Sequence, residues 1–186
     1  GATGFVGKKL VSQLINRGHK VSILTRDTEI ARKRLPMDCE FHKWEPELYP
    51  PSSQAFDGVN AVVHLAGENI ANKRWSESRK NKIKDSRVLS TRNLVSTLKS
   101  MKNAPDTFVS ASAVGFYGKD KPVELYEDLD PGKDFLADVC KEWEHEAFVA
   151  KNHNIRTIAL RIGIVLGYEG GAIKKMLLPF WAGVGG

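Results

Sequence analysis

The sequence lacks the features that mark membrane, disulfide-rich and zinc-binding proteins. No apolar run approaches the ~20 residues that a membrane-spanning helix needs, and no signal-peptide pattern is visible. The two cysteines, Cys39 and Cys140, are too few and too far apart for a disulfide framework or a zinc site. We therefore expect a globular protein of a reducing compartment, cytoplasmic unless an upstream targeting segment directs it to an organelle.

Negative charge is scarcer than positive charge, with 22 Asp and Glu against 28 Lys and Arg. Much of the excess falls in residues 73–87, where seven cations face only Glu77 and Asp85. Such a stretch could bind nucleic acid, but Trp75 is its one aromatic residue and no recognition motif accompanies it. The composition favours a solvated helix face. The alternative is that some of these cations help to bind a cofactor phosphate, and nucleic-acid binding is the least favoured interpretation. The cations are Lys73, Arg74, Arg79, Lys80, Lys82, Lys84 and Arg87.

Glycine, in contrast, is concentrated at the start of the chain. Residues 1–7 read G-x-x-G-x-x-G and run straight into an apolar helical pattern. Glycines in this spacing permit a tight turn, a close approach of the backbone to a pyrophosphate, and packing of the helix on its sheet. The start of the helix adds unpaired N–H groups and a positive dipole end. The stretch therefore predicts a dinucleotide-binding turn.

The residues that would meet the adenosine ribose come at the end of the next predicted strand. That strand, residues 20–25, ends in Thr25-Arg26, where an NAD enzyme would carry Asp or Glu. An arginine there favours a 2′-phosphate and hence NADP(H), and the alternative is an ordinary turn with a surface arginine. A doubly wound sheet has a central strand before the glycine turn, so we expect that strand upstream of Gly1.

Predicted helices and strands alternate along the chain, which is typical of an α/β protein with a doubly wound parallel sheet and helices on both faces. We expect a single NADP-binding Rossmann domain over residues 1–186, cut at both ends, with residues 168–186 beginning a substrate-binding part. Helices are predicted over 5–17, 28–35, 76–101, 134–151 and 172–181, and strands over 20–25, 39–44, 61–67, 107–112 and 155–160.

Ligands of such sheets bind beyond the carboxyl ends of the strands, and three of these ends carry suitable residues. Thr25-Arg26 follows one strand, residues 66–69 (AGEN) follow another, and Ser112 ends a third. Ala66 and Gly67 are small enough to let a nucleotide pass. The hydroxyl of Ser112 would lie at the same edge.

Longer motifs carry a resemblance to a known family. HLAGENI at 64–70, SASAVGFYG at 110–118 and ALRIGIVLG at 159–167 resemble an extended or atypical short-chain dehydrogenase/reductase. More narrowly, the chain is similar to the NAD-dependent epimerase/dehydratase-like branch of "epimerase family proteins", which includes family 39U. The narrower motifs are LAGENI, RW at 74–75, SR at 86–87, DFLADVCKEWE at 134–144, RIGIVLG and MLLPF at 176–180.

The resemblance implies NADP(H) binding and assigns cofactor contacts to positions that match the family's motifs. They are the phosphate loop Gly1, Thr3, Gly4, Phe5, Val6 and Gly7; Thr25 and Arg26 at the ribose phosphate; Leu65 and Ala66 along the adenine and ribose; Lys82 and Arg87 from the long helix; and Leu166 near the nicotinamide.

The resemblance does not extend to the usual catalytic pair. Active short-chain dehydrogenases use Tyr-x-x-x-Lys, in which the lysine lowers the pKa of the tyrosine and a nearby serine or threonine polarises the substrate oxygen. When Glu144 is aligned with the glutamate that follows the lysine by four, Leu136 and Cys140 occupy the tyrosine and lysine positions. A shift of one residue does not restore the pair. Only the serine survives, as Ser112.

Four other side chains could take part in chemistry, and each has a plainer alternative. Tyr117 is the phenol nearest the expected site but is more often a packing residue in such a position. Glu68 could be an acid, bind a sugar hydroxyl or cap the next segment. For Cys140 a buried thiol, and for His64 a buried and hydrogen-bonded histidine, are the favoured interpretations.

Two functional hypotheses remain. The first is an NADP(H)-dependent oxidoreductase or nucleotide-sugar epimerase-like enzyme that acts on a small molecule, either a sugar nucleotide or a carbonyl compound, with Ser112 and Tyr117 as candidate catalytic residues. The second is a non-catalytic NADP-binding protein with a regulatory or redox-sensing role. Neither hypothesis needs a metal or a membrane, and a homodimer is left open.

Overall fold

The computed structural model describes residues 1–36, 38–71, 74–119, 124–167, 170–171, 181 and 183. Four helices alternate with five parallel strands in this part of the chain. The helices are α1 (Phe5–Asn16), α2 (Thr28–Arg34), α3 (Glu77–Ser100) and α4 (Phe135–Phe148). The parallel strands are β1 (Val21–Thr25), β2 (Cys39–Lys43), β3 (Ala61–His64), β4 (Thr107–Ala113) and β5 (Arg156–Ile162), and a short antiparallel pair follows, β6 (Leu166–Gly167) with β7 (Gly170–Gly171).

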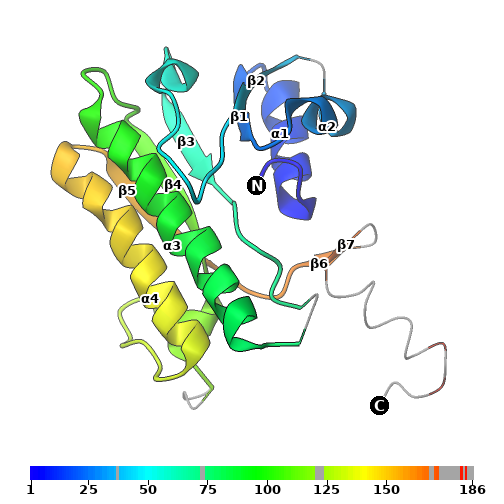
Figure 1. The fold of residues 1–186 in the computed structure, drawn as a ribbon, viewed down its shortest axis with the longest axis vertical. Helices are drawn as coiled ribbons and strands as arrows, with labels where there is room; N and C mark the ends of the chain where they lie inside the picture. The colour runs from blue at the N-terminus through cyan, green and yellow to red at the C-terminus, as the bar shows by residue number, and fades with distance from the viewer. Residues whose placement is uncertain are drawn as a thin grey trace.

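The parallel strands form two ladders, one of β1 and β2 and one in the order β3-β4-β5. Figure 1 shows α3 and α4 side by side across one face of the β3-β4-β5 ladder, and α1 and α2 beside the β1–β2 pair. The fold is therefore parallel α/β, as the alternation of predicted elements indicated. Among the described residues, no helix combines the length and the apolar composition needed to cross a membrane.

The main hydrophobic core lies where α3 packs on the larger ladder. Leu94 and Leu98 of α3 and Phe108 of β4 are almost completely buried there, together with Trp44 and Phe56. On the outer surface, two ion pairs join α3 to α4. They link Lys84 to Glu142 and Arg92 to Glu146, each at 2.7 Å. A smaller cluster of Val11, Ile23, Leu35 and Cys39 holds α1 and α2 against the β1–β2 pair.

Most predicted elements are confirmed, and the differences arise at their ends. Ser76 caps α3 as predicted by accepting a hydrogen bond from the Arg79 N–H. The strand predicted over 61–67 stops at His64, because the residues after it turn toward α3. The helix predicted over 134–151 ends at Phe148 and continues as a 3₁₀ turn, which Asn154 closes in the left-handed conformation (φ 61°). Residues 172–180 of the last predicted helix lie outside the described part of the chain.

His64, at the end of β3, is buried and hydrogen-bonded, as predicted. Its Nε2 lies 3.1 Å from the hydroxyl of Ser90, which itself donates to the carbonyl of Ser86 at 2.7 Å. The imidazole therefore donates its Nε2–H to Ser90 in the neutral state. Burial lowers the pKa of His64 from 6.5 to about 3.

This buried histidine makes the stability of the fold pH-dependent. The unfolded chain binds a proton at His64 below pH 6.5 and the folded chain does not, so stability is complete above pH 6.5 and is lost as the pH falls. We expect the free energy of unfolding to drop by about 2 kcal/mol between pH 6.5 and 5, as measured by urea denaturation. His64→Gln keeps a hydrogen-bond donor for Ser90 and should remove the part of the pH dependence of the free energy of unfolding that is due to His64. Parallel pH profiles of the two proteins would contradict the assignment.

Candidate functional site

Helix α1 begins with an open, positively polarised end. Gly4 is its N-cap residue and has no side chain to cap the helix, and the first turn contains no acidic residue. Within the described residues, the N–H groups of Phe5, Val6 and Gly7 have no hydrogen-bond acceptor. Unpaired N–H groups and the helix dipole together favour an anion at this point.

The glycines before and inside α1 are required by close backbone contacts. A Cβ on Gly1 would collide with the backbone of Leu65, which follows β3. A Cβ on Gly7 would collide with the Gly1 carbonyl and lie 2.6 Å from Ala2 Cα. Gly4 is different, because its Cβ would meet only the Gly1 carbonyl, at 3.1 Å. The turn is therefore folded tightly upon itself and against β3, and its residues fit the phosphate cradle that the sequence predicts.

At the end of β1, the only acidic side chain is already engaged. Asp27 accepts a hydrogen bond from the Ile30 N–H at 2.9 Å and so caps α2. The hydroxyl of Thr25 turns back and donates to the Asp27 carbonyl at 3.2 Å. Arg26, between them, is exposed. The position that would read the ribose in a dinucleotide site therefore presents a guanidinium rather than a carboxylate.

Beyond β3, one face of α3 holds the segment Leu65–Ile70. The Glu68 N–H donates to the Ser86 hydroxyl at 3.0 Å, and Arg87 Nη2 donates to the Glu68 carbonyl at 3.0 Å. Arg79 binds the Glu68 carboxylate at 2.8 Å and also donates to the Asn69 carbonyl. Ala66 and Gly67 are thereby fixed beside the glycine turn, and the Arg87 guanidinium lies against Gly67.

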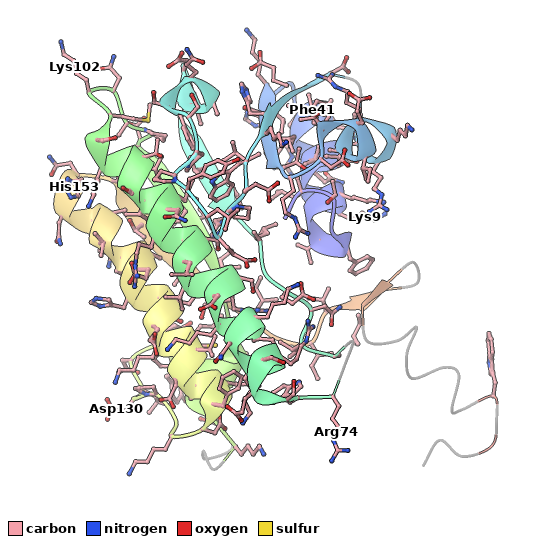
Figure 2. All side chains as sticks on the ribbon, in the orientation of Figure 1. Lys9, Phe41, Arg74, Lys102, Asp130 and His153 are labelled. Atoms are coloured by element: carbon pink, nitrogen blue, oxygen red, sulfur yellow. The ribbon has the colours of Figure 1, made fainter. Side chains whose placement is uncertain are left out.

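The basic stretch 73–87 is not the solvated helix face that composition favoured. Arg79 is only 8% exposed, and Arg87 is half-buried, with its guanidinium 5.4 Å from the centre of the Trp143 ring. Burial lowers the pKa of Arg87. Lys82 does remain exposed, and Arg74 points away from the body of the protein (Figure 2). The prediction of a solvated face is therefore wrong for Arg79 and Arg87, because both bind the segment after β3. Lys73 lies outside the described residues.

The β6–β7 pair lies against the start of α1. The ring of Phe5 packs on Gly167 and Gly170, where a side chain on either glycine would overlap it. Leu166, which the resemblance places near the nicotinamide, is 62% exposed on this hairpin. Its role stays a prediction.

Ser112 and Tyr117, the predicted catalytic residues, are connected through an ion pair between the buried Glu144 and the partly buried Arg161. The Ser112 hydroxyl donates to Glu144 Oε1 at 2.6 Å. Arg161 donates to both oxygens of Glu144, from Nε at 2.9 Å and from Nη2 at 3.0 Å, and to the Tyr117 hydroxyl from Nη1 at 2.8 Å. Ser112 is 3% and Tyr117 5% exposed. The network joins β4, α4 and β5 and keeps both hydroxyls inside the protein.

Sequence reasoning missed the roles of Glu144, Arg161 and Arg79. A signal was available, because a charged residue within an apolar strand such as Arg161 must be paired if it is buried. Cys140 is buried beside Ser112, and burial raises the pKa of its thiol, so the prediction of a buried cysteine is confirmed. No group of His, Cys, Asp and Glu suited to a metal ion occurs in the described ranges.

A cavity of about 450 Å³ lies between the first turns of α3 and α4. Three lysines and three acidic residues line it, so its charges balance and it offers no attraction to an anionic cofactor. It contains none of the predicted site residues.

The difference between Gly7 and Gly4 gives a test of the cradle. Gly7→Ala forces a backbone clash, so we expect it to lower the free energy of unfolding by about 1–3 kcal/mol. Gly4→Ala, its matched control, should have a much smaller effect because only one atom has to move slightly. Chemical denaturation of the ligand-free protein measures both, and equal losses would contradict the packing described here.

Comparison with known proteins agrees with this geometry. The NAD dependent epimerase/dehydratase family matches residues 1–182. The "Epimerase family protein SDR39U1 homolog, chloroplastic" of Arabidopsis thaliana is 37% identical over 97% of this chain and 52% of its own length. The epimerase family protein YfhF of Bacillus subtilis is 35% identical over 97% of this chain and 58% of its own length. The chain thus spans little more than half the length of these curated relatives.

Solved structures give the same result. The human epimerase family protein SDR39U1 (isoform 2), solved with NADPH, is 32% identical with a TM-score of 0.80, over 100% of this chain and 59% of that one. The nucleoside-diphosphate sugar epimerase from Corynebacterium glutamicum is 37% identical with a TM-score of 0.78, over 97% of this chain and 36% of that one. The glycine cradle, the parallel α/β fold and these matches lead to one conclusion: the chain belongs to the NAD-dependent epimerase/dehydratase family.

Proposed function

We propose that this protein binds NADP(H) and serves as an oxidoreductase or nucleotide-sugar epimerase-like enzyme. The observation that carries the cofactor assignment is the end of β1, where Arg26 is exposed while Asp27 is engaged in capping α2. A 2′-phosphate suits a guanidinium, whereas the ribose hydroxyl of NAD(H) suits a free carboxylate. The human relative solved with NADPH supports the same choice.

The other predicted contacts fit a dinucleotide that extends from Arg26 across the glycine turn. The pyrophosphate would accept hydrogen bonds from the N–H groups at the start of α1, and the small residues Ala66 and Gly67 leave room beside it. Lys82 is exposed near this segment, close enough to affect the Glu68 carboxylate. Arg87 would act by fixing Gly67, since its guanidinium is already bound to protein carbonyls.

For the chemical step, the cofactor supplies hydride transfer and the protein must supply position and a proton. Ser112 and Tyr117 are the candidates that the resemblance leaves. The Ser112 hydroxyl donates to Glu144, so Ser112 would have to turn its hydroxyl to reach a substrate oxygen. Substrates of the proposed enzyme are sugar nucleotides or carbonyl compounds.

One observation favours a second candidate function, a non-catalytic NADP-binding protein. Leu136 and Cys140 occupy the positions of the usual tyrosine and lysine, and both replacements lack a group that could exchange a proton at neutral pH while buried. Binding would then stabilise the protein or report the redox state of the nicotinamide pool.

The cofactor assignment is tested by charge reversal at Arg26. We expect Arg26→Glu to weaken NADPH binding about a hundredfold in calorimetry, because the carboxylate repels the 2′-phosphate, and to change NADH binding less than about threefold. Arg17→Glu is the control, since it makes the same change in net charge at the other end of α1. Equal losses for both cofactors would remove the NADP assignment.

The two candidate functions differ in turnover. Purified protein should either oxidise NADPH with a carbonyl compound, whose carbonyl carbon accepts the hydride, or interconvert the epimers of a sugar nucleotide with NADP⁺ and no net change of the cofactor. Ser112→Ala should reduce either rate at least about tenfold while NADPH binding stays within about twofold. Tight NADPH binding without turnover across a broad substrate screen would favour the non-catalytic function.

A further inference from the structure

Glu68 lies in a strongly basic part of the proposed cofactor site, where the other carboxylate described above, Asp27, is already engaged in capping α2. Arg79 hydrogen-bonds to it and is the main reason that the pKa of Glu68 lies below its usual value; Lys82 and Arg26 act in the same direction, whereas burial opposes them. Arg26 is the residue proposed to meet the 2′-phosphate, and Lys82 is a predicted cofactor contact from α3. A carboxylate therefore lies near the place where a doubly charged phosphate would bind.

The structure fixes where the Glu68 side chain goes. Its backbone N–H and carbonyl are both bound by α3, through Ser86 and Arg87. Arg79 Nη1 then donates a hydrogen bond to Glu68 Oε1 at 2.8 Å, and no described residue binds Glu68 Oε2. The carboxylate is thus drawn toward α3, and its charge is largely cancelled by a guanidinium that is 8% exposed.

Arg79 is a costly way to stabilise the fold. Its Nε is buried without an acceptor among the described residues. Removing a guanidinium from water costs several kcal/mol, and a buried ion pair often does no better than an apolar side chain of the same size. Stability alone therefore does not account for an arginine at this position, whereas control of the Glu68 charge does.

We propose that Arg79 is a specificity-determining residue that neutralises Glu68 and so lets the site accept the 2′-phosphate of NADP(H). This inference rests on the proposed function. With Arg79 in place, Arg26 and Lys82 are available to the phosphate and the nearby carboxylate is masked. Without it, Glu68 would repel the phosphate and could accept a ribose hydroxyl, as the acidic residue of an NAD site does.

The test is a double-mutant cycle read out as cofactor selectivity, the ratio of the dissociation constants of NADH and NADPH measured by calorimetry at one low ionic strength. We expect Arg79→Met to lower this ratio about tenfold, mainly by weakening NADPH. Adding Glu68→Gln to Arg79→Met should return the ratio to within about threefold of the original, because the repelling charge is gone.

Three single variants complete the design. Arg79→Lys keeps the charge and should keep the selectivity within about twofold. Lys80→Met removes a cation from the same turn of α3, one that pairs with Glu77 at 2.7 Å, and should change nothing. Glu68→Gln alone should raise the selectivity for NADPH about threefold, which tests the idea even if Arg79→Met does not fold.

The outcomes separate this inference from the function on which it rests. If the original protein shows no preference for NADPH, both the proposed NADP(H) function and the role of Arg79 are overturned. Original protein that prefers NADPH, with Arg79→Met weakening both cofactors equally, overturns the role of Arg79 alone and leaves it a structural residue. The role of Arg79 is also overturned if Glu68→Gln does not restore the NADH/NADPH ratio in the Arg79→Met background, or does not raise it in the original protein.

Discussion

The close approach of Gly1 to the backbone of Leu65 is the contact on which the site depends. It brings the open start of α1 to the carboxyl end of β3, with no side chain in between. Gly7 allows the same turn to fold back on Gly1 and Ala2. β1 and β3 belong to separate parallel ladders, but their carboxyl ends come to the same region, because the charge of Arg26 after β1 reaches the carboxylate of Glu68 after β3. A dinucleotide site is the natural use of this arrangement.

Helix α3 has a second role besides covering the sheet. Its buried face contributes Leu94 and Leu98 to the core, and its first three turns bind the segment after β3 through Arg79, Ser86 and Arg87. Arg79 and Arg87, two cations of the basic stretch 73–87, thereby bind protein groups instead of facing the solvent. The neighbouring lysines at 80 and 84 pair with carboxylates, whereas Arg74 and Lys82 stay exposed.

The Ser112–Glu144–Arg161–Tyr117 network holds both predicted catalytic residues and joins β4, α4 and β5. Arg161 uses its planar guanidinium to bind both oxygens of Glu144, which satisfies a buried carboxylate and joins β5 to α4. Ser112, a predicted catalytic residue, is part of this network through its hydrogen bond to Glu144. A catalytic role for Ser112 would require its hydroxyl to leave Glu144, and family membership alone does not supply that step.

The sequence by itself determined the alternation of helices and strands, the glycine turn at residues 1–7 and the basic residue after β1. Each of these depends on short-range periodicity or on the conformational needs of a few adjacent residues. Only the tertiary structure decided what the charged side chains do. Arg79 and Glu68 are 11 residues apart, and Arg161 and Tyr117 are 44 apart, so no local pattern relates them. Their pairing follows from the packing of α3 and α4 on the sheet, because a charge that packing removes from water must find a partner wherever the chain provides one.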